Sequence, residues 1–164
     1  MPLLVLARHA FTPSAPASGT TDFERPLDAT GLAQARRMGA FLAAFAAGEG
    51  TPLDTVIASA AVRTMQTARA AAEGLGMDAE AVRPDRALYD ATAAEWEEAI
   101  ATIPARASGA LVVGHQPALT DIVAARSGVW PLPGLRPSTV AVFRLDSWEQ
   151  EPPYGEPAVL RDFV

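Results

Sequence analysis

The chain has 164 residues, of which 49% are apolar and 20% are charged, and this composition is typical of one ordinary globular domain. Its net charge of −6 argues against a nucleic-acid partner, and the absence of cysteine excludes disulfides, thiolate metal sites and a thiol nucleophile. All 13 basic residues are arginine, so a Schiff-base lysine and a phosphate-binding loop of the Walker type are excluded as well.

The organisation of the chain is simple. No internal repeat and no change of composition marks a domain linker. No apolar run reaches the length of about 18 residues that a membrane span needs, and no charged leader precedes a long apolar core at the N-terminus. We therefore expect a single cytoplasmic domain over residues 1–164, with neither a membrane nor a nucleic acid as partner.

The first half of the chain alternates short apolar runs with segments of helical period. Residues 3–7, LLVLA, form the first run, and residues 32–45 follow with apolar side chains at helical spacing after Asp28 as N-cap. Residues 55–59, TVIAS, form the second run, and residues 62–75 form a second helical segment that ends in glycines. The pattern predicts two strands that are each followed by a helix.

The same alternation continues in the second half. A weaker strand near residues 81–83 and a short helix over residues 96–103 precede a third clear run, ALVVG, at residues 110–114. Helical spacing returns over residues 119–123. These segments add at least one more buried strand and two more helices to the predicted fold.

The C-terminal part differs, because two strand-like segments follow one another without a helix between them. Residues 139–145 and 157–164 are joined by a turn-rich, acidic segment, which predicts a hairpin or a pair of edge strands. Alternating helices and continuously apolar strands predict an α/β fold with a largely parallel central sheet that is covered on both faces.

Two connections are unusual. Residues 11–27 are longer than the roughly 2 to 6 residues that are common between a strand and its helix, which often indicates a functional loop. Residues 128–137 are rich in proline and glycine. Either loop could border a pocket, or both could be surface connections stiffened by proline.

All three apolar strands end near a cationic or titratable side chain. The first is followed by Arg8 and His9, the second leads to Arg63 in the first turn of the next helix, and the third is followed by His115. These are the only two histidines of the chain. Because ligands of open α/β sheets bind beyond the carboxyl ends of the strands, we expect these side chains to form one pocket.

Such a pocket suits a tetrahedral oxyanion, and a phosphoryl group is the natural ligand. A neutral imidazole whose other nitrogen is held by a hydrogen bond can act as a nucleophile, and neighbouring arginines would lower its pKa and stabilise the transferring phosphoryl oxygens. A metal site is disfavoured, because two histidines without a third clustered ligand do not form one. The residues therefore predict phosphoryl transfer through histidine.

Five segments of the chain resemble the histidine phosphatase (phosphoglycerate mutase-like) superfamily. They are LARHA at residues 6–10, RPLDATGLAQA at 25–35, IASAAVRTMQTA at 57–68, LYDAT at 88–92 and LVVGHQP at 111–117. The small size of the chain and the RPL…TG…QA pattern are most similar to the SixA-type phosphohistidine phosphatases. The resemblance implies a three-layer, Rossmann-like α/β/α fold and neither a metal nor an organic cofactor.

The resemblance also implies the roles of the site residues. His9 would be the nucleophile that becomes phosphorylated, and Arg8, Arg63 and His115 would hold the phosphoryl group. Water would then attack phospho-His9 and release inorganic phosphate. The implied substrate is a phosphohistidine protein, or alternatively a small phosphorylated metabolite.

The general acid and a further substrate contact are assigned by the same resemblance. The family's acid is usually a glutamate that follows a leucine, so Asp90 is the first candidate and Glu95 the second. Arg25, at the end of the long loop, could bind substrate or could be a surface arginine. Ala10 stands where many members have glycine, and Ala15 falls near the asparagine of mutases, which weakens a mutase interpretation.

Two alternative functions remain. A serine hydrolase would use Ser59 with His115 and Asp121, but no glycine flanks Ser59 to allow the strained turn of a nucleophile elbow. We expect Ser59 to cap the helix that carries Arg63, and Gln66 to pack or bond locally. A non-catalytic module that binds phosphorylated ligands would use the same pocket, although it would have no need of a nucleophile.

Overall fold

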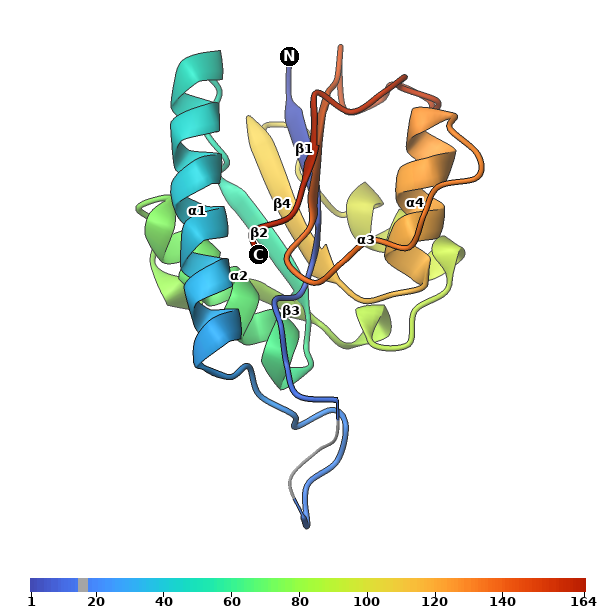
Figure 1. Ribbon diagram of the computed structural model, residues 1–164. Coiled ribbons are helices and arrows are strands. Elements are labelled where there is room, and N and C mark those ends of the chain that lie inside the picture. The colour runs from blue at the N-terminus through green and yellow to red at the C-terminus, as the bar shows by residue number, and fades with distance from the viewer. Residues whose placement is uncertain (15–17) are drawn as a thin grey trace.

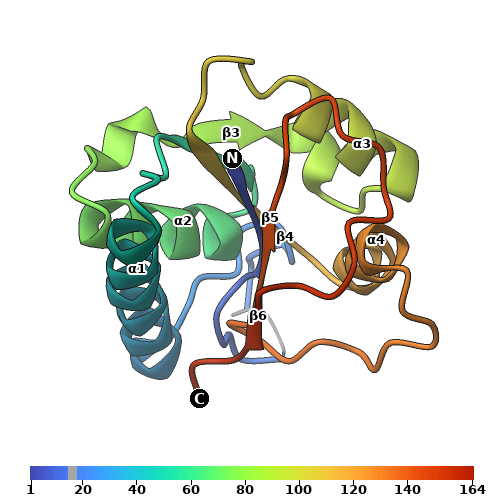
Figure 2. The same cartoon turned by 90° about the horizontal axis from the view of Figure 1, so that it is seen from above.

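The protein is a six-stranded sheet between two layers of helices, seen in a computed structural model that describes residues 1–14 and 18–164 (Figures 1 and 2). The strands are β1 (Leu3–Arg8), β2 (Thr55–Ser59), β3 (Arg83–Asp85), β4 (Gly109–Gly114), β5 (Val140–Arg144) and β6 (Val159–Arg161). The helices are α1 (Ala29–Glu49), α2 (Val62–Gly74), α3 (Ala93–Ala101) and α4 (Ala118–Ser127), with single 3-10 turns η1 (Ala79–Ala81) and η2 (Arg86–Leu88). The α/β fold predicted from the sequence is confirmed. Ala15, which the sequence analysis compared with the asparagine of mutases, lies outside the described residues.

The sheet is parallel on one side and antiparallel at the other. Its order is β3-β2-β4-β1-β5-β6, and the first four strands of this order run parallel. Strand β5 pairs antiparallel with β1, and β6 pairs antiparallel with β5, which confirms the predicted C-terminal edge pair. The weak strand predicted near residues 81–83 lies slightly later, because η1 occupies the residues before it.

The core lies on both faces of the sheet, because successive side chains of a strand point to opposite faces. On β1, Leu3 and Val5 pack toward α1 and α2, while Leu4 and Leu6 pack toward α3 and α4. Figure 2 shows the two pairs of helices on opposite sides of the sheet. Burial of both faces explains why β1 and β4 are continuously apolar rather than alternating. Among the described residues, no helix combines the length and the apolarity that a bilayer requires.

Helix α1 begins as predicted and packs unusually close to α2. Asp28 is its N-cap, and the carboxylate accepts a hydrogen bond of 2.8 Å from the backbone N–H of Gly31. A Cβ at Gly39 would lie 2.9 Å from the Cα of Ala71, and one at Gly74 would lie 2.8 Å from the backbone of Gly39. The two helix backbones therefore touch, which only glycine permits at these positions.

The base of the loop over residues 11–27 is fastened to both helices at the carboxyl end of the sheet, below the sheet in Figure 1. The backbone N–H of Phe11 donates to Oε1 of Gln34, and that of Leu27 donates to Oε1 of Gln66, both at 2.8 Å. Gln66 was expected to pack or bond locally, and its hydrogen bond instead reaches Leu27, which lies 39 residues away in sequence. These bonds hold the entry and the exit of the loop beside the ends of β1 and β2.

Candidate active site

The carboxyl ends of β1, β2 and β4 bring the predicted site residues together. Arg8 pairs in register with Gly114, so His9 and His115 follow directly on neighbouring parallel strands. Their ring centroids are 5.5 Å apart, and both side chains are buried. Arg63, also buried, enters the same pocket from the first turn of α2.

His9 is held in one tautomer by its own backbone neighbourhood. Its Nδ1 lies 2.8 Å from the carbonyl oxygen of Ala10, and because a carbonyl only accepts, Nδ1 carries the proton. Burial, together with the positive charges of Arg8 and Arg63, lowers the pKa of His9 to about 4 against the opposing effect of the Ala10 hydrogen bond. The ring is therefore neutral at pH 7 and keeps a lone pair on Nε2, as a nucleophile requires.

His115 is held through its other nitrogen. Its Nε2 lies 2.7 Å from Oγ of Ser59, a fully buried hydroxyl that has no other hydrogen-bond acceptor within the described chain. Ser59 therefore donates to Nε2, which puts the ring proton on Nδ1. Burial lowers the pKa of His115 to about 3, with a further contribution from Arg63. His115 is thus a neutral hydrogen-bond donor through Nδ1.

The contact between Ser59 and His115 does not form a hydrolase triad. Ser59 is completely buried and so cannot reach a substrate, and within the described residues Nδ1 of His115 has no hydrogen-bond partner, which leaves Asp121 without a role. The expectation that Ser59 caps α2 was also wrong, because the N-cap is Ala61 and it makes no side-chain cap bond.

The two arginines are each held at one end of the guanidinium group. Arg8 donates from Nη1 to the carbonyl oxygen of Leu135 at 2.7 Å, and Arg63 donates from Nη1 to the carbonyl oxygen of Asp22 at 2.7 Å. The Nε of each is buried without a hydrogen-bond partner among the described residues. Burial and the neighbouring Arg63 lower the pKa of Arg8, so a bound anion would relieve the repulsion between the two cations.

Three buried donors at this end of the sheet thus have no acceptor among the described residues. Of the five such buried nitrogens in the described part of the chain, three belong to this pocket: Nε of Arg8, Nε of Arg63 and Nδ1 of His115. The other two are Nε1 of Trp96 and Nε of Arg126. Unpaired buried donors are costly, so these three nitrogens are available to an anion that binds at this end of the sheet.

Asp22 also belongs to the site, although the sequence interpretation missed it. Its Oδ2 accepts from Nη2 of Arg63 at 3.1 Å and from the hydroxyl of Tyr89 at 2.9 Å. Its Oδ1 accepts from Nε and Nη2 of Arg25 at 3.1 and 2.9 Å. Arg25 also donates from Nη1 to the carbonyl oxygen of Pro13, so every donor atom of its guanidinium is engaged by the loop itself. The sequence signal that could have indicated Asp22 was the spacing of three residues between this acid and Arg25.

The two candidate general acids lie in different settings. Asp90 is exposed, follows Tyr89 at the pocket wall and has a left-handed backbone with φ of 55°, which aspartate tolerates better than most residues. Glu95 forms a capping box with Thr92 at the start of α3, which lowers the pKa of its carboxyl. Its structural role and its strongly held negative charge make Glu95 a poor proton donor.

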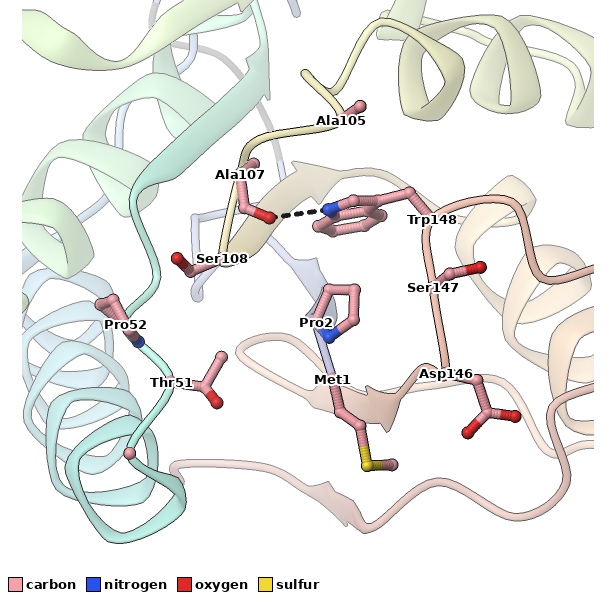
Figure 3. A pocket seen from close by; sticks show the side chains of 11 residues that line it. Met1, Pro2, Thr51, Pro52, Ala105, Ala107, Ser108, Asp146, Ser147 and Trp148 are labelled. Carbon is pink, nitrogen blue, oxygen red and sulfur yellow. Dashed lines mark hydrogen bonds between the residues drawn. The ribbon is translucent and has the colours of Figure 1, made fainter.

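Two hollows lie at opposite ends of the sheet. A cavity of about 510 Å³ borders Arg8 and is walled by the loop over residues 128–137, including Leu135 and Arg136. The hollow in Figure 3, about 400 Å³, is lined by Met1, Pro2 and Trp148 and lies at the amino end of β1, away from the histidines. Only the first hollow adjoins the candidate active site. Throughout the described ranges, no group of three or more His, Asp or Glu side chains could hold a metal ion.

The sequence and the fold both match known proteins. The histidine phosphatase superfamily, branch 1, matches residues 4–111. A structure from Nakamurella multipartitia, provisionally assigned as the phosphohistidine phosphatase SixA, is 29% identical, covers 99% of this chain and 96% of its own, and has a TM-score of 0.74. The provisionally assigned SixA of Agrobacterium tumefaciens is 27% identical, covers 88% and 91%, and has a TM-score of 0.71.

A third structure is similar in fold. The protein histidine phosphatase SixA complexed with tungstate has a TM-score of 0.71 and 20% identity over 88% of each chain. No curated protein matches the sequence. The roles of the individual site residues rest on the contacts of this chain's own side chains.

Proposed function

This chain belongs to the histidine phosphatase superfamily, and on that premise we propose that it hydrolyses a phosphoryl group through a phosphohistidine intermediate on His9. Its family and its structural neighbours support a phosphatase. The observation that carries the finer proposal is the tautomer of His9, whose Nδ1–H donates to the Ala10 carbonyl and leaves Nε2 beside three unpaired donors.

The first step transfers the phosphoryl group to the enzyme. Nε of Arg8, Nε of Arg63 and Nδ1–H of His115 bind the phosphoryl oxygens and stabilise their charge in the transition state. The lone pair on Nε2 of His9 forms a bond to phosphorus while the bond to the leaving group breaks, and its electron pair stays on the leaving atom. Asp90 is the candidate that protonates this atom.

The second step returns the enzyme to its starting state. Water attacks phosphorus of phospho-His9 and gives a proton to the Asp90 carboxylate, the P–N bond breaks, and its electron pair returns to Nε2 as inorganic phosphate leaves. The Ala10 carbonyl keeps the Nδ1 proton in place in both steps, so His9 needs no change of tautomer. No metal or organic cofactor takes part in this scheme.

The proposed substrate is a phosphohistidine protein. Two structural neighbours above 25% identity carry a provisional assignment as phosphohistidine phosphatases. An imidazole is a good leaving group that needs little help from an acid, and Asp90, the candidate acid, is exposed. A small phosphorylated metabolite with a poor alkoxide leaving group would depend far more on Asp90.

Intact-mass measurement tests the mechanism. The wild type and His9→Ala are mixed briefly with a phosphoramidate and quenched without acid. We expect a transient gain of one acid-labile phosphoryl group in the wild type and none in the variant. No adduct and no phosphate release from any donor, despite phosphate binding, would leave a phosphoryl-binding module instead.

A comparison of two phosphoryl donors, a phosphohistidine peptide and an alkyl phosphate, tests the proposed substrate class. Asp90→Asn should change the turnover of a phosphohistidine peptide by less than about threefold, because imidazole leaves readily. The same variant should slow hydrolysis of an alkyl phosphate by about 100-fold, the usual contribution of a general acid. Equal losses with both donors would argue against the phosphohistidine assignment.

A further inference from the structure

The side chain of Asp22 is the point where the long loop meets the phosphoryl pocket. Four hydrogen bonds from three residues reach its carboxylate: one from Arg63, one from Tyr89 and two from Arg25. A fifth bond runs from Nη1 of Arg63 to the Asp22 carbonyl oxygen. The side chain is 50% exposed, so this residue of the loop is an accessible surface acid that nevertheless contacts a buried arginine.

These bonds occupy only one edge of the Arg63 guanidinium. A guanidinium group offers an end edge, formed by Nη1 and Nη2, and a side edge that includes Nε. Asp22 takes the end edge with its carbonyl and its carboxylate, while Nε remains buried without a partner in the described chain. Arg8 is held in a similar way, because the Leu135 carbonyl binds its Nη1 and leaves Nε unpaired.

The same loop segment also fixes the wall next to His115. The Tyr89 ring meets the His115 ring edge-on, with centroids 5.6 Å apart, and its hydroxyl donates to Asp22. Phe23 packs edge-on against Tyr89 at 5.0 Å, and its carbonyl oxygen accepts from the backbone N–H of Val62 at the start of α2. Asp22 is therefore held rigidly between the helix that carries Arg63 and the segment that packs on His115.

We propose that Asp22 is a positioning residue for phosphoryl transfer. By binding the end edge of the Arg63 guanidinium group, Asp22 turns the side edge of that group toward the phosphoryl group. The inference rests on the proposed function. It also assigns a purpose to the loop over residues 11–27, because the loop supplies an acid that the ends of β1, β2 and β4 lack.

If Asp22 instead competed with the phosphoryl group for Arg63, the predicted change in phosphate affinity would have the opposite sign. A carboxylate that competed with the phosphoryl group for Arg63 would act as a latch, and its removal would strengthen phosphate binding. A positioning carboxylate leaves Nε available, and its removal weakens the binding of any ligand that needs an aligned guanidinium. The sign of the change in anion affinity therefore separates the two roles.

The first test compares Asp22→Ala with Glu24→Gln, a matched control. Glu24 is an exposed acid of the same loop whose side chain accepts a hydrogen bond from the N–H of Thr21, and glutamine keeps an acceptor there. We expect Asp22→Ala to lower kcat by about 100-fold, the loss that a misplacement of about 1 Å can cause. Vanadate inhibition should weaken by a similar factor and inorganic phosphate binding by less than tenfold, because the transition-state geometry of vanadate demands alignment.

A double-mutant cycle provides the readout that a purely structural role would not move. In an Arg63→Ala background, Asp22→Ala should cost less than about twofold more, because the group that it positions is gone. Multiplicative losses would indicate that Asp22 only fastens the loop. Tighter phosphate binding in Asp22→Ala would indicate a latch, and either result overturns the proposal.

Milder variants keep the proposal testable if Asp22→Ala folds poorly. Asp22→Asn retains the backbone carbonyl and one side-chain oxygen, and Tyr89→Phe removes only the hydroxyl, so each should cost about three- to tenfold in kcat with an unchanged melting temperature. An active wild type with undiminished Asp22 variants overturns this inference alone. A wild type that forms no phosphoenzyme removes the proposed function instead.

Discussion

The ends of β1 and β4 are each followed by a buried histidine, but the two rings form their hydrogen bonds through different nitrogens. His9 and His115 each follow an apolar strand, each is buried, and each has a pKa far below 6.5. His9 bonds through Nδ1 to a carbonyl oxygen, whereas His115 bonds through Nε2 to a hydroxyl. One contact per ring therefore decides which histidine offers a lone pair and which offers a proton.

The largest expected loss of activity follows substitution of His9, which removes the lone pair on Nε2. His9→Ala should lower kcat by at least about 10⁴-fold, because the reaction loses its nucleophile while the phosphoryl donors remain. Inorganic phosphate should still bind within about tenfold of the wild-type affinity, which calorimetry would measure. Turnover in this variant at more than a hundredth of the wild-type rate would contradict the assignment.

The next largest loss of activity follows substitution of His115, the hydrogen-bond donor after the neighbouring strand. His115→Ala should lower kcat by about 10² to 10³-fold, the usual loss of one preorganised oxyanion donor. Asparagine places an amide N–H where Nδ1 stood and should recover part of this loss, whereas glutamine, which mimics Nε2, should not. Steady-state kinetics of the three variants would check the tautomer, and better rescue by glutamine would reverse it.

The low pKa values of both rings predict a loss of stability in acid. The unfolded chain binds more protons than the folded one between the ordinary histidine pKa of 6.5 and the folded values of about 4 and about 3. The free energy of unfolding should therefore be fully present above pH 7 and fall by about 2 kcal/mol between pH 6 and pH 5. Urea titrations would measure it, and His115→Asn should roughly halve the slope.

The smallest effect concerns the contact that orients His115. Ser59→Ala should lower kcat by about tenfold, because Nε2 loses its donor and the ring no longer favours one tautomer. Thr64→Val is a suitable control, since it removes another fully buried hydroxyl whose bonds go only to backbone carbonyls. Equal losses of activity in the two variants would show a general packing effect rather than control of the tautomer.

The elements that position the site could be predicted from the sequence because they follow from periodicity. Continuous apolar runs indicated buried parallel strands, and parallel strands place their carboxyl ends at one edge, which brings Arg8, His9, Arg63 and His115 together. The capping box of Thr92 and Glu95 also carries a sequence signature, a threonine followed three residues later by glutamate, but the sequence interpretation considered Glu95 only as a candidate acid.

The remaining parts depend on contacts that no periodicity encodes. Asp22 reaches Arg63 only through the path of an irregular loop, and Ser59 finds His115 only because β2 and β4 pair in this register. Hydrogen-bond partners separated by 41 and 56 residues leave no local pattern in the chain. Sequence reasoning therefore predicted which of these residues lie close together and missed how their side chains are oriented.

The close fit of Trp96 under Gly114 gives the active site an optical signal. A Cβ at Gly114 would lie 2.1 Å from the indole ring, and Trp96 is fully buried next to the residue that precedes His115. Trp130, by contrast, is 62% exposed. We therefore expect the indole of Trp96, in contact with the end of β4, to contribute the most blue-shifted part of the tryptophan fluorescence, and its emission should change when an anion binds, without any label.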